Sequence, residues 1–126
     1  MAEDGVGTTG VGEGRLSVAV RGAPGSRVLV LHGELDHDTA DVLREALDGC
    51  LAAAPARILL DFADLRFCDS TGLNVLLRAR LAARESGREV ELCGLGPQVA
   101  RLFEITGAGG VFRVHPSVAQ ALSSDG

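Results

Sequence analysis

Short apolar runs that alternate with amphipathic stretches constrain the fold of this chain more than any other feature of its sequence. Residues 58–60 are a continuous apolar run between two charged residues, which is typical of a strand covered on its faces in a parallel sheet. Before this run, residues 38–54 carry apolar side chains at three- and four-residue steps, which predicts a helix capped by Asp38 and ended by Pro55. The expected buried stripe of this helix comprises Leu43, Ala46, Leu47, Cys50, Leu51 and Ala54.

The same alternation continues along the rest of the chain. We expect a hairpin from residues 16–20 and 28–31, a helix over residues 70–86 ended by Gly87, a strand at 90–93, a helix from Pro97 to a C-cap at Gly107, a strand at 111–114 and a short helix at 116–122. This order indicates an α/β fold with a mixed sheet of four to five strands, antiparallel at the hairpin and parallel within, and about four helices. A chain of 126 residues accommodates one such domain, over residues 15–123.

The first fourteen residues differ in composition from the rest of the chain. Glycine occupies five of these positions, and three others are acidic. Such a segment buries too little apolar surface to offset the entropy lost on ordering it. We therefore predict a disordered tail over residues 1–14 that folding does not require.

Charge and composition argue against several classes of function. The net charge is −5, so the field of the protein repels phosphate backbones and nucleic-acid binding is not expected. All twelve basic residues are arginine, and the absence of lysine excludes a P-loop that depends on its lysine, Schiff-base catalysis and a response-regulator receiver of the usual kind. No run has the length of a membrane span, and the N-terminus does not have the pattern of a signal peptide. We expect a cytoplasmic protein.

The cysteines and histidines do not form a metal-binding pattern. Cys50, Cys68 and Cys93 are odd in number and widely spaced, and each lies in an apolar neighbourhood. We interpret them as reduced thiols in the core. The three histidines are likewise scattered, and we expect neither a metal nor a cofactor.

Residues 67–77 place an acid, two hydroxyls and a glycine directly before a long apolar helical run. Asp69 and Ser70 are both good N-cap residues, so one reading is that the hydroxyls of Ser70 and Thr71 only cap the helix. The other reading is that Ser70 accepts a phosphate, because the helix dipole favours negative charge at this end. The motif alone leaves both readings open.

Two acidic residues follow strands that we expect to be neighbours in the sheet. Since the carboxyl ends of parallel strands meet at one edge, the loop with Asp36 and His37 should approach the loop with Asp69 and Ser70. The pair Asp36 and Asp69 could serve in acid–base chemistry, hold Mg²⁺, organise the loops, or position Ser70 for a partner. We favour the last two roles, because no third ligand and no nucleophilic triad accompany the pair, and we expect no enzymatic activity.

The helix over residues 70–86 has a less regular surface than the helix before it. Its expected buried side comprises Val75, Leu76, Ala79, Ala82 and Ala83. The opposite side mixes leucines with Asn74 and arginines, which leaves open whether Leu77 and Leu81 are core or interface. We expect Leu73, in the first turn beside Ser70, to be exposed.

Three segments together resemble the anti-sigma factor antagonists of the STAS domain family. They are Gly33-Glu34-Leu35-Asp36, Asp69-Ser70-Thr71-Gly72-Leu73, and Pro97-x-Val99-x-x-Leu102-Phe103, and the resemblance extends from about Leu16 to about Leu122. It implies a STAS fold and an anti-anti-sigma factor that sequesters an anti-sigma factor and frees a sigma factor for transcription. It also implies that the partner is a serine kinase that phosphorylates Ser70 and so ends binding, and that a serine phosphatase restores it. The implied partner-binding residues are Glu34, Asp36, His37, Asp69, Ser70, Thr71, Gly72, Leu73 and Asn74.

Two other classes of function remain as alternatives. The chain could be a structural STAS subunit of a stress-signalling scaffold or of a transporter complex, in which the hydroxyl need not be phosphorylated. It could also be a small hydrolase that uses Asp36 and Asp69, which steady nucleotide turnover by the pure protein would reveal.

Overall fold

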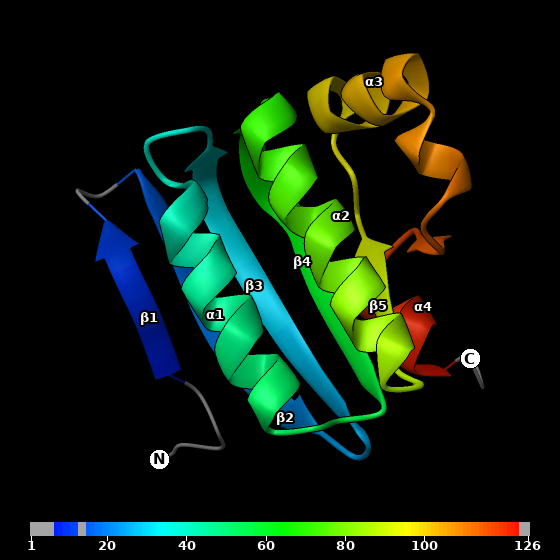
Figure 1. Cartoon of the computed structure of the whole chain (residues 1–126). Coiled ribbons are helices and arrows are strands. Elements are labelled where there is room, and N and C mark those ends of the chain that lie inside the picture. Colours follow the sequence, from blue (N-terminus) through cyan, green and yellow to red (C-terminus); the bar gives the residue numbers. More distant parts are fainter. Residues whose placement is uncertain (1–6, 13–14, 124–126) are drawn as a thin grey trace.

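In the computed structural model, residues 7–12 and 15–123 are described, and they form six strands and four α-helices (Figure 1). The strands are β1 (Gly7–Gly12), β2 (Leu16–Ala23), β3 (Ser26–Leu35), β4 (Arg57–Cys68), β5 (Glu89–Cys93) and β6 (Val114–His115). The helices are α1 (Ala40–Ala52), α2 (Ser70–Glu85), α3 (Pro97–Thr106) and α4 (Val118–Ser123), with a 3₁₀ turn at Ala108–Gly110.

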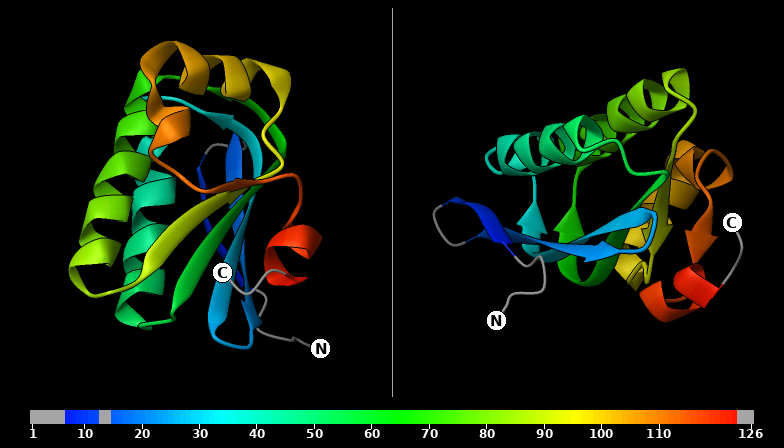
Figure 2. Two further views of the ribbon diagram at one scale, coloured as in Figure 1. Left: turned by 90° about the vertical axis from the view of Figure 1, so that its right-hand side faces the viewer. Right: turned by 90° about the horizontal axis from the view of Figure 1, so that it is seen from below.

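All six strands belong to one sheet, in the order β1-β2-β3-β4-β5-β6. Strands β1, β2 and β3 pair antiparallel, and β3, β4, β5 and β6 pair parallel. Helices α1 and α2 lie side by side on one face of the sheet, and α4 lies on the other (Figure 2). The mixed α/β fold predicted from the sequence is confirmed.

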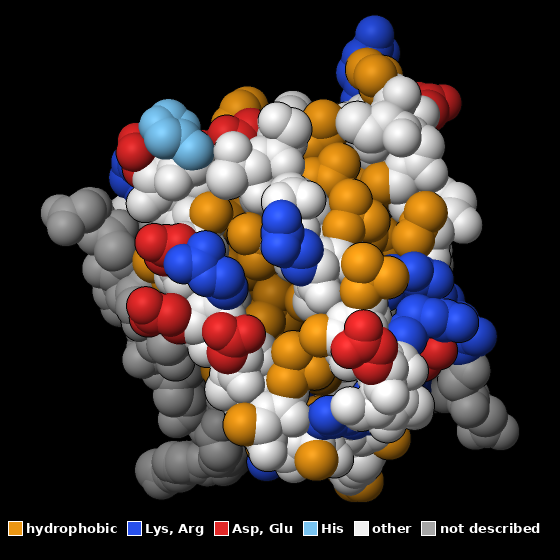
Figure 3. All heavy atoms as spheres, in the orientation of Figure 1, with side chains coloured by type: hydrophobic (Ala, Val, Ile, Leu, Met, Phe, Trp, Pro, Cys, Tyr) orange, Lys and Arg blue, Asp and Glu red, His pale blue; other side chains and the backbone are white. Residues whose placement is uncertain are grey.

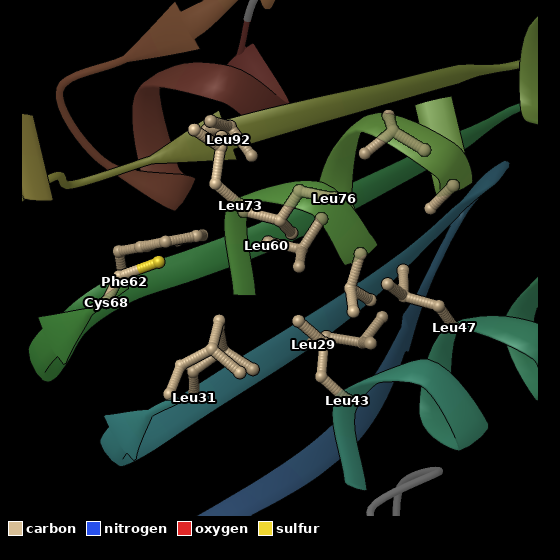
Figure 4. Packing of buried hydrophobic residues seen from close by; sticks show 14 of the residues in the cluster. Leu29, Leu31, Leu43, Leu47, Leu60, Phe62, Cys68, Leu73, Leu76 and Leu92 are labelled. Carbon is tan, nitrogen blue, oxygen red and sulfur yellow. The ribbon is translucent and has the colours of Figure 1, made fainter. Parts of the chain in front are cut away.

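The main core lies between the sheet and the helices α1 and α2. Most of the predicted helical stripes are buried there, including Leu43, Leu47 and Leu76 (Figure 4). Two predicted core positions are wrong. Ala54 is exposed because it lies beyond the end of α1, at a φ of +57°. Ala82 is exposed because it faces α1 across a surface hollow rather than the sheet.

Strand β1 contradicts the prediction of a wholly disordered tail. Residues 7–12 pair antiparallel with β2, from Gly7 opposite Val20 to Gly12 opposite Leu16. The composition argument missed this strand because pairing with the edge of β2 is made by backbone groups, which every residue but proline supplies. Strand β1 also raises the sheet to six strands among the described residues, where four or five were expected. The rest of the predicted tail, residues 1–6 and 13–14, lies outside the described residues.

The predicted strand at residues 111–114 is also shorter than expected. Only Val114 belongs to a strand, because the chain before it continues the 3₁₀ turn, and the N–H of Val111 donates to the carbonyl of Ala108. Phe112 is buried and packs on Phe103, with 5.9 Å between the ring centroids.

The three cysteines are buried and form no disulfide, which agrees with the interpretation as core thiols. Burial raises the pKa of Cys68 to about 12 and that of Cys93 to about 11. Their thiolate forms are therefore scarce at neutral pH, and the thiols have little nucleophilic character. None of the described helices is both long enough and apolar enough to cross a membrane.

A buried ion cluster joins β4, β5 and β6. The carboxylate of Glu91 accepts hydrogen bonds from Arg57 Nε at 3.0 Å and Nη2 at 2.8 Å, and its Oε1 lies 2.7 Å from His115 Nε2. Burial raises the pKa of Glu91, but the hydrogen bonds from Arg57 and His115 outweigh it and lower the pKa below its ordinary value. Arg57 also donates to the carbonyl of Ala121, which ties α4 to the same cluster.

We predict that Glu91→Ala lowers the free energy of unfolding at pH 7 by about 3–5 kcal/mol, because it leaves the Arg57 guanidinium without its carboxylate. Since the folded pKa of Glu91 is lowered, its contribution is complete above the unfolded pKa of about 4.3 and is lost as the pH falls through the folded value. Urea unfolding at pH 7 and under acidic conditions measures both effects. Glu89→Ala is the matched control on the same strand. Glu89 forms an exposed ion pair with Arg84, and such a pair contributes about 1 kcal/mol or less to the free energy of unfolding. Equal losses in the two variants would contradict the prediction.

Candidate functional site

Two loops meet at the edge of the sheet where β3 and β4 end. Leu35 and Cys68, the last residues of these strands, are paired in the parallel register. The N–H of Asp69 then donates to the carbonyl of Leu35 at 3.1 Å. The expectation that the loop of Asp36 approaches the loop of Asp69 and Ser70 is confirmed.

Asp69 caps helix α2. Its backbone is extended, its carboxylate accepts a hydrogen bond from the N–H of Gly72 at 3.0 Å, and its carbonyl accepts one from the N–H of Leu73 at 3.0 Å. Ser70 is the first residue of the helix and is exposed. Its hydroxyl makes no hydrogen bond to any of the residues that the structure describes. Of the two residues that could cap this helix, Asp69 does so, and the hydroxyl of Ser70 stays at the surface.

Asp36 organises the loop between β3 and α1. Its Oδ1 accepts hydrogen bonds from the N–H groups of Asp38 at 2.9 Å and Thr39 at 3.2 Å, and Arg15 Nη2 lies 2.7 Å from both carboxylate oxygens. Burial raises the pKa of Asp36, but the hydrogen bond from Asp38 and the charge of Arg15 bring it below its ordinary value. Asp36 is therefore an ionised structural group at neutral pH, which argues against a role as a general acid.

The predicted cap of α1 is wrong. The N-cap position of α1 belongs to Thr39 rather than Asp38, whose side chain is exposed. The carboxylate of Asp36 accepts the N–H groups of Asp38 and Thr39, and this turn keeps both residues outside the helix, which begins at Ala40. The buried Thr39 hydroxyl completes the loop, because it accepts from the N–H of Asp36 and donates to the carbonyl of Glu34, each at 2.9 Å.

Two glycines permit the close approach of these segments. A Cβ on Gly72 would lie 2.5 Å from Leu35 Cγ and 3.2 Å from Cys68 Sγ. Gly33 has a φ of +114°, and a Cβ there would lie 2.0 Å from the carbonyl oxygen of Arg15. The glycines of both sequence motifs are thus required by packing.

Leu73 is buried, which contradicts the expectation that it is exposed. Only 5% of its surface is accessible, and it lies among the core side chains on the side of α2 that faces the sheet (Figure 4). Leu73 precedes Leu76 by three residues, and this step places both on one face of the helix. Leu77 is half-buried against the core, whereas Leu81 is 59% exposed.

A surface hollow of about 380 Å³ lies between α1 and α2 and begins beside the site. His37, Thr71 and Asn74 line it at the end near Ser70, and all three are exposed. In Figure 3, apolar side chains are visible along the boundary of the two helices, with charged side chains beside them. The apolar lining of the hollow comprises Ala40, Leu47, Leu51, Val75, Ala79 and Ala82.

The predicted site residues therefore separate into two groups. Glu34, His37, Ser70, Thr71 and Asn74 are fully or partly accessible and surround the two loops. Asp36 and Asp69 are also partly accessible, but their carboxylates are engaged with the backbone, and together with the buried Gly72 and Leu73 they fix the conformation. Sequence reasoning missed Arg15, Thr39 and Gln98, which hold the loops from outside the motifs, because no local pattern marks such long-range contacts. Among the residues that the structure describes, no cluster of three or more side chains could hold a metal ion.

Comparison with known proteins places this geometry in a family. The family model described as "Mlab, STAS domain" matches residues 18–116. An anti-sigma F factor antagonist from Paenibacillus polymyxa is 31% identical over 100 residues, which cover 79% of this chain and 86% of that protein. An anti-sigma factor antagonist from Mycobacterium paratuberculosis has a similar structure, with a TM-score of 0.74, 25% identity and coverage of 97% of this chain and 95% of that one.

A further similar structure is that of the Bacillus anti-sigma factor antagonist SpoIIAA. In its unphosphorylated form it has a TM-score of 0.73 and 22% identity, and the match covers 83% of this chain and 92% of SpoIIAA. A structure of the phosphorylated form matches with a TM-score of 0.67 and 21% identity over 84% of this chain and 96% of that one. At this level of identity the likeness concerns the fold.

We predict that Gly72→Ala lowers the free energy of unfolding by about 1–3 kcal/mol, because the new methyl group overlaps Leu35 in a packed core. The matched control is Gly49→Ala in α1, where a Cβ meets no atom within 4 Å among the described residues. That substitution should stabilise the helix by about 0.5–1 kcal/mol. Urea unfolding of the two variants distinguishes them, and a neutral or stabilising Gly72→Ala would show that the contact is not tight in solution.

Proposed function

This chain belongs to the STAS domain family, and we propose that it acts within that family as an anti-sigma factor antagonist. It binds and sequesters an anti-sigma factor, which frees a sigma factor for transcription. The bound partner is a serine kinase that transfers phosphate to Ser70, and the phosphorylated form no longer binds. A serine phosphatase removes the phosphate and restores binding. The chain itself supplies a surface and an acceptor hydroxyl, and the partner supplies the nucleotide and the catalysis.

The observation that carries this proposal is the position of the Ser70 hydroxyl. Because Asp69 already satisfies the cap of α2, Ser70 is exposed and is not needed to hold the helix. An exposed serine at a helix start is well placed to accept phosphate, since the dipole favours an added anion there. The printed name of the Paenibacillus relative and the existence of SpoIIAA in two phosphorylation states support the same reading.

The proposed partner surface consists of the accessible residues around Ser70. Glu34 contributes from the end of β3, His37 contributes from the loop after it, and Thr71 and Asn74 contribute from the first turns of α2. Asp36 and Asp69 support this surface from behind through their hydrogen bonds. Leu73 supports it from the core, so it is not among the residues that we expect to touch the partner.

Phosphorylation would act on this surface through charge. A phosphoserine adds roughly −1.5 to −2 charges at neutral pH, next to Asp69 and close to the loop of Asp36. In the free protein, water and the helix dipole stabilise this charge. A partner surface fitted to a neutral hydroxyl would have to bury it without a counter-charge, which costs several kcal/mol. The modification should therefore prevent binding without disturbing the fold.

The partner is identified by affinity capture from native extract with the unmodified protein as bait, followed by mass spectrometry. We expect an anti-sigma factor with a kinase domain. Capture of scaffold or transporter subunits in its place would support a structural STAS subunit and overturn the proposal.

Incubation of the captured kinase with ATP and the pure protein, followed by phosphopeptide mapping, then locates the phosphate. Phosphate on Thr71 and none on Ser70 would contradict the assignment.

We predict that Ser70→Ala folds normally, resists phosphorylation and binds the captured kinase constitutively. Ser70→Asp should also fold, but it should bind at least about tenfold more weakly, because it places an unpaired charge in the interface. Ser86→Ala is the matched control, since it removes an exposed serine hydroxyl at the other end of α2 and leaves the acceptor and the proposed partner surface intact. Calorimetric titration measures the affinities, and thermal unfolding checks the fold. Equal affinities of Ser70→Ala and Ser70→Asp would contradict the charge mechanism.

A further inference from the structure

The side chain of Gln98 makes a two-point contact with the backbone just before the site. Its Oε1 accepts a hydrogen bond from the N–H of Cys68 at 3.0 Å, and its Nε2 donates to the carbonyl of the same residue at 3.2 Å. Both contacts are fulfilled by one orientation of the amide. Gln98 lies in the first turn of α3, and Val99 and Phe103 anchor this helix in the core with 1% of their surface accessible.

Gln98 makes the hydrogen bonds that a neighbouring strand would otherwise make with the end of β4. The pairing of β4 with β5 ends at Asp61 and Cys93, but β4 continues to Cys68. In a strand, alternate residues direct their N–H and C=O groups to opposite sides. Asp69 donates its N–H toward β3, so the backbone groups of Cys68 face the side on which β5 has already ended. The amide of Gln98 has the donor and acceptor of a peptide group and occupies that place.

We propose that Gln98 is a positioning residue for Ser70. Cys68 is followed directly by Asp69, the cap of α2, and then by Ser70. The hydrogen bond from Asp69 to Leu35 fixes this segment toward β3, and Gln98 fixes it on the opposite side. With both contacts in place, the first turn of α2 has one conformation relative to the sheet. The inference deepens the proposed function, because it concerns how the proposed acceptor is presented to a kinase.

The chain contains two glutamines, which supplies a matched control. Gln98→Ala removes the contact, whereas Gln120→Ala removes an exposed glutamine side chain of α4 that has no hydrogen bond to the described residues. Amide hydrogen exchange, followed by NMR under conditions where both variants are fully folded, reports on the segment. We expect faster exchange in Gln98→Ala at Cys68, and about two- to tenfold faster exchange at Gly72 and Leu73, whose N–H groups bond to Asp69. Gln120→Ala should leave all three amides unchanged.

Exchange that accelerates at Cys68 but not at Gly72 and Leu73 would overturn the proposal, because Gln98 would then only fasten α3 to the strand. This measurement needs no partner, so its outcome does not depend on the proposed function.

The second measurement is the rate of phosphate transfer to Ser70 by the kinase captured with the wild-type protein. We expect a lower kcat in Gln98→Ala and an unchanged kcat in Gln120→Ala. An unchanged kcat in Gln98→Ala would also overturn the proposal, whereas absence of transfer to the wild-type protein would count against the proposed function alone.

Discussion

The parallel pairing of β3 with β4 is the constraint on which the site depends. Because both strands run in one direction, their carboxyl ends reach the same edge of the sheet, and the hydrogen bond from Asp69 to Leu35 joins the loops that follow. The start of α2 packs against Leu35 and Cys68 only because Gly72 lacks a side chain, and Gly33 gives β3 room to approach the backbone of Arg15. Residues far apart in the sequence are thus brought together by sheet register, and the loop residues then refine a geometry that the strands have already set.

The carboxylates of Asp36 and Asp69 each stabilise one of the two loops at this edge. Asp69 satisfies backbone donors at the start of α2, and Asp36 satisfies those of the loop before α1 while it pairs with Arg15. Both groups are engaged within the chain, which separates this site from an acid–base pair that must exchange protons with a substrate. The side chain of Ser70, by contrast, is exposed at the surface.

The parts of the fold that local signals determine could be predicted from the sequence, and the parts that distant contacts determine could not. The start of α2 at Ser70 and its stop near Gly87 are local, and both are confirmed; of the two caps that the sequence offered, Asp69 and Ser70, the structure uses Asp69. Asp38 looked equally good as a cap, but Asp36, held by Arg15, accepts the N–H groups of Asp38 and Thr39, and the resulting turn places the helix start after Thr39. The contact of Gln98 with Cys68 joins α3 to β4, and no periodicity within either segment indicates it. Strand β1 was not predicted because backbone pairing between strands does not require a particular amino-acid composition.

The distribution of charge around α2 bears on how a modified Ser70 would behave. Arg15 is already close to two carboxylates, with its Nη2 2.7 Å from Asp36 and 3.4 Å from Asp38. Its charge is therefore largely compensated before any phosphate is added. The dipole of α2 would add about 0.3–1 kcal/mol of stabilisation for an exposed anion at its N-terminus. A phosphate that is stabilised this weakly by its own chain would stay hydrated and accessible, which is what the proposed switch requires of a group that a phosphatase removes.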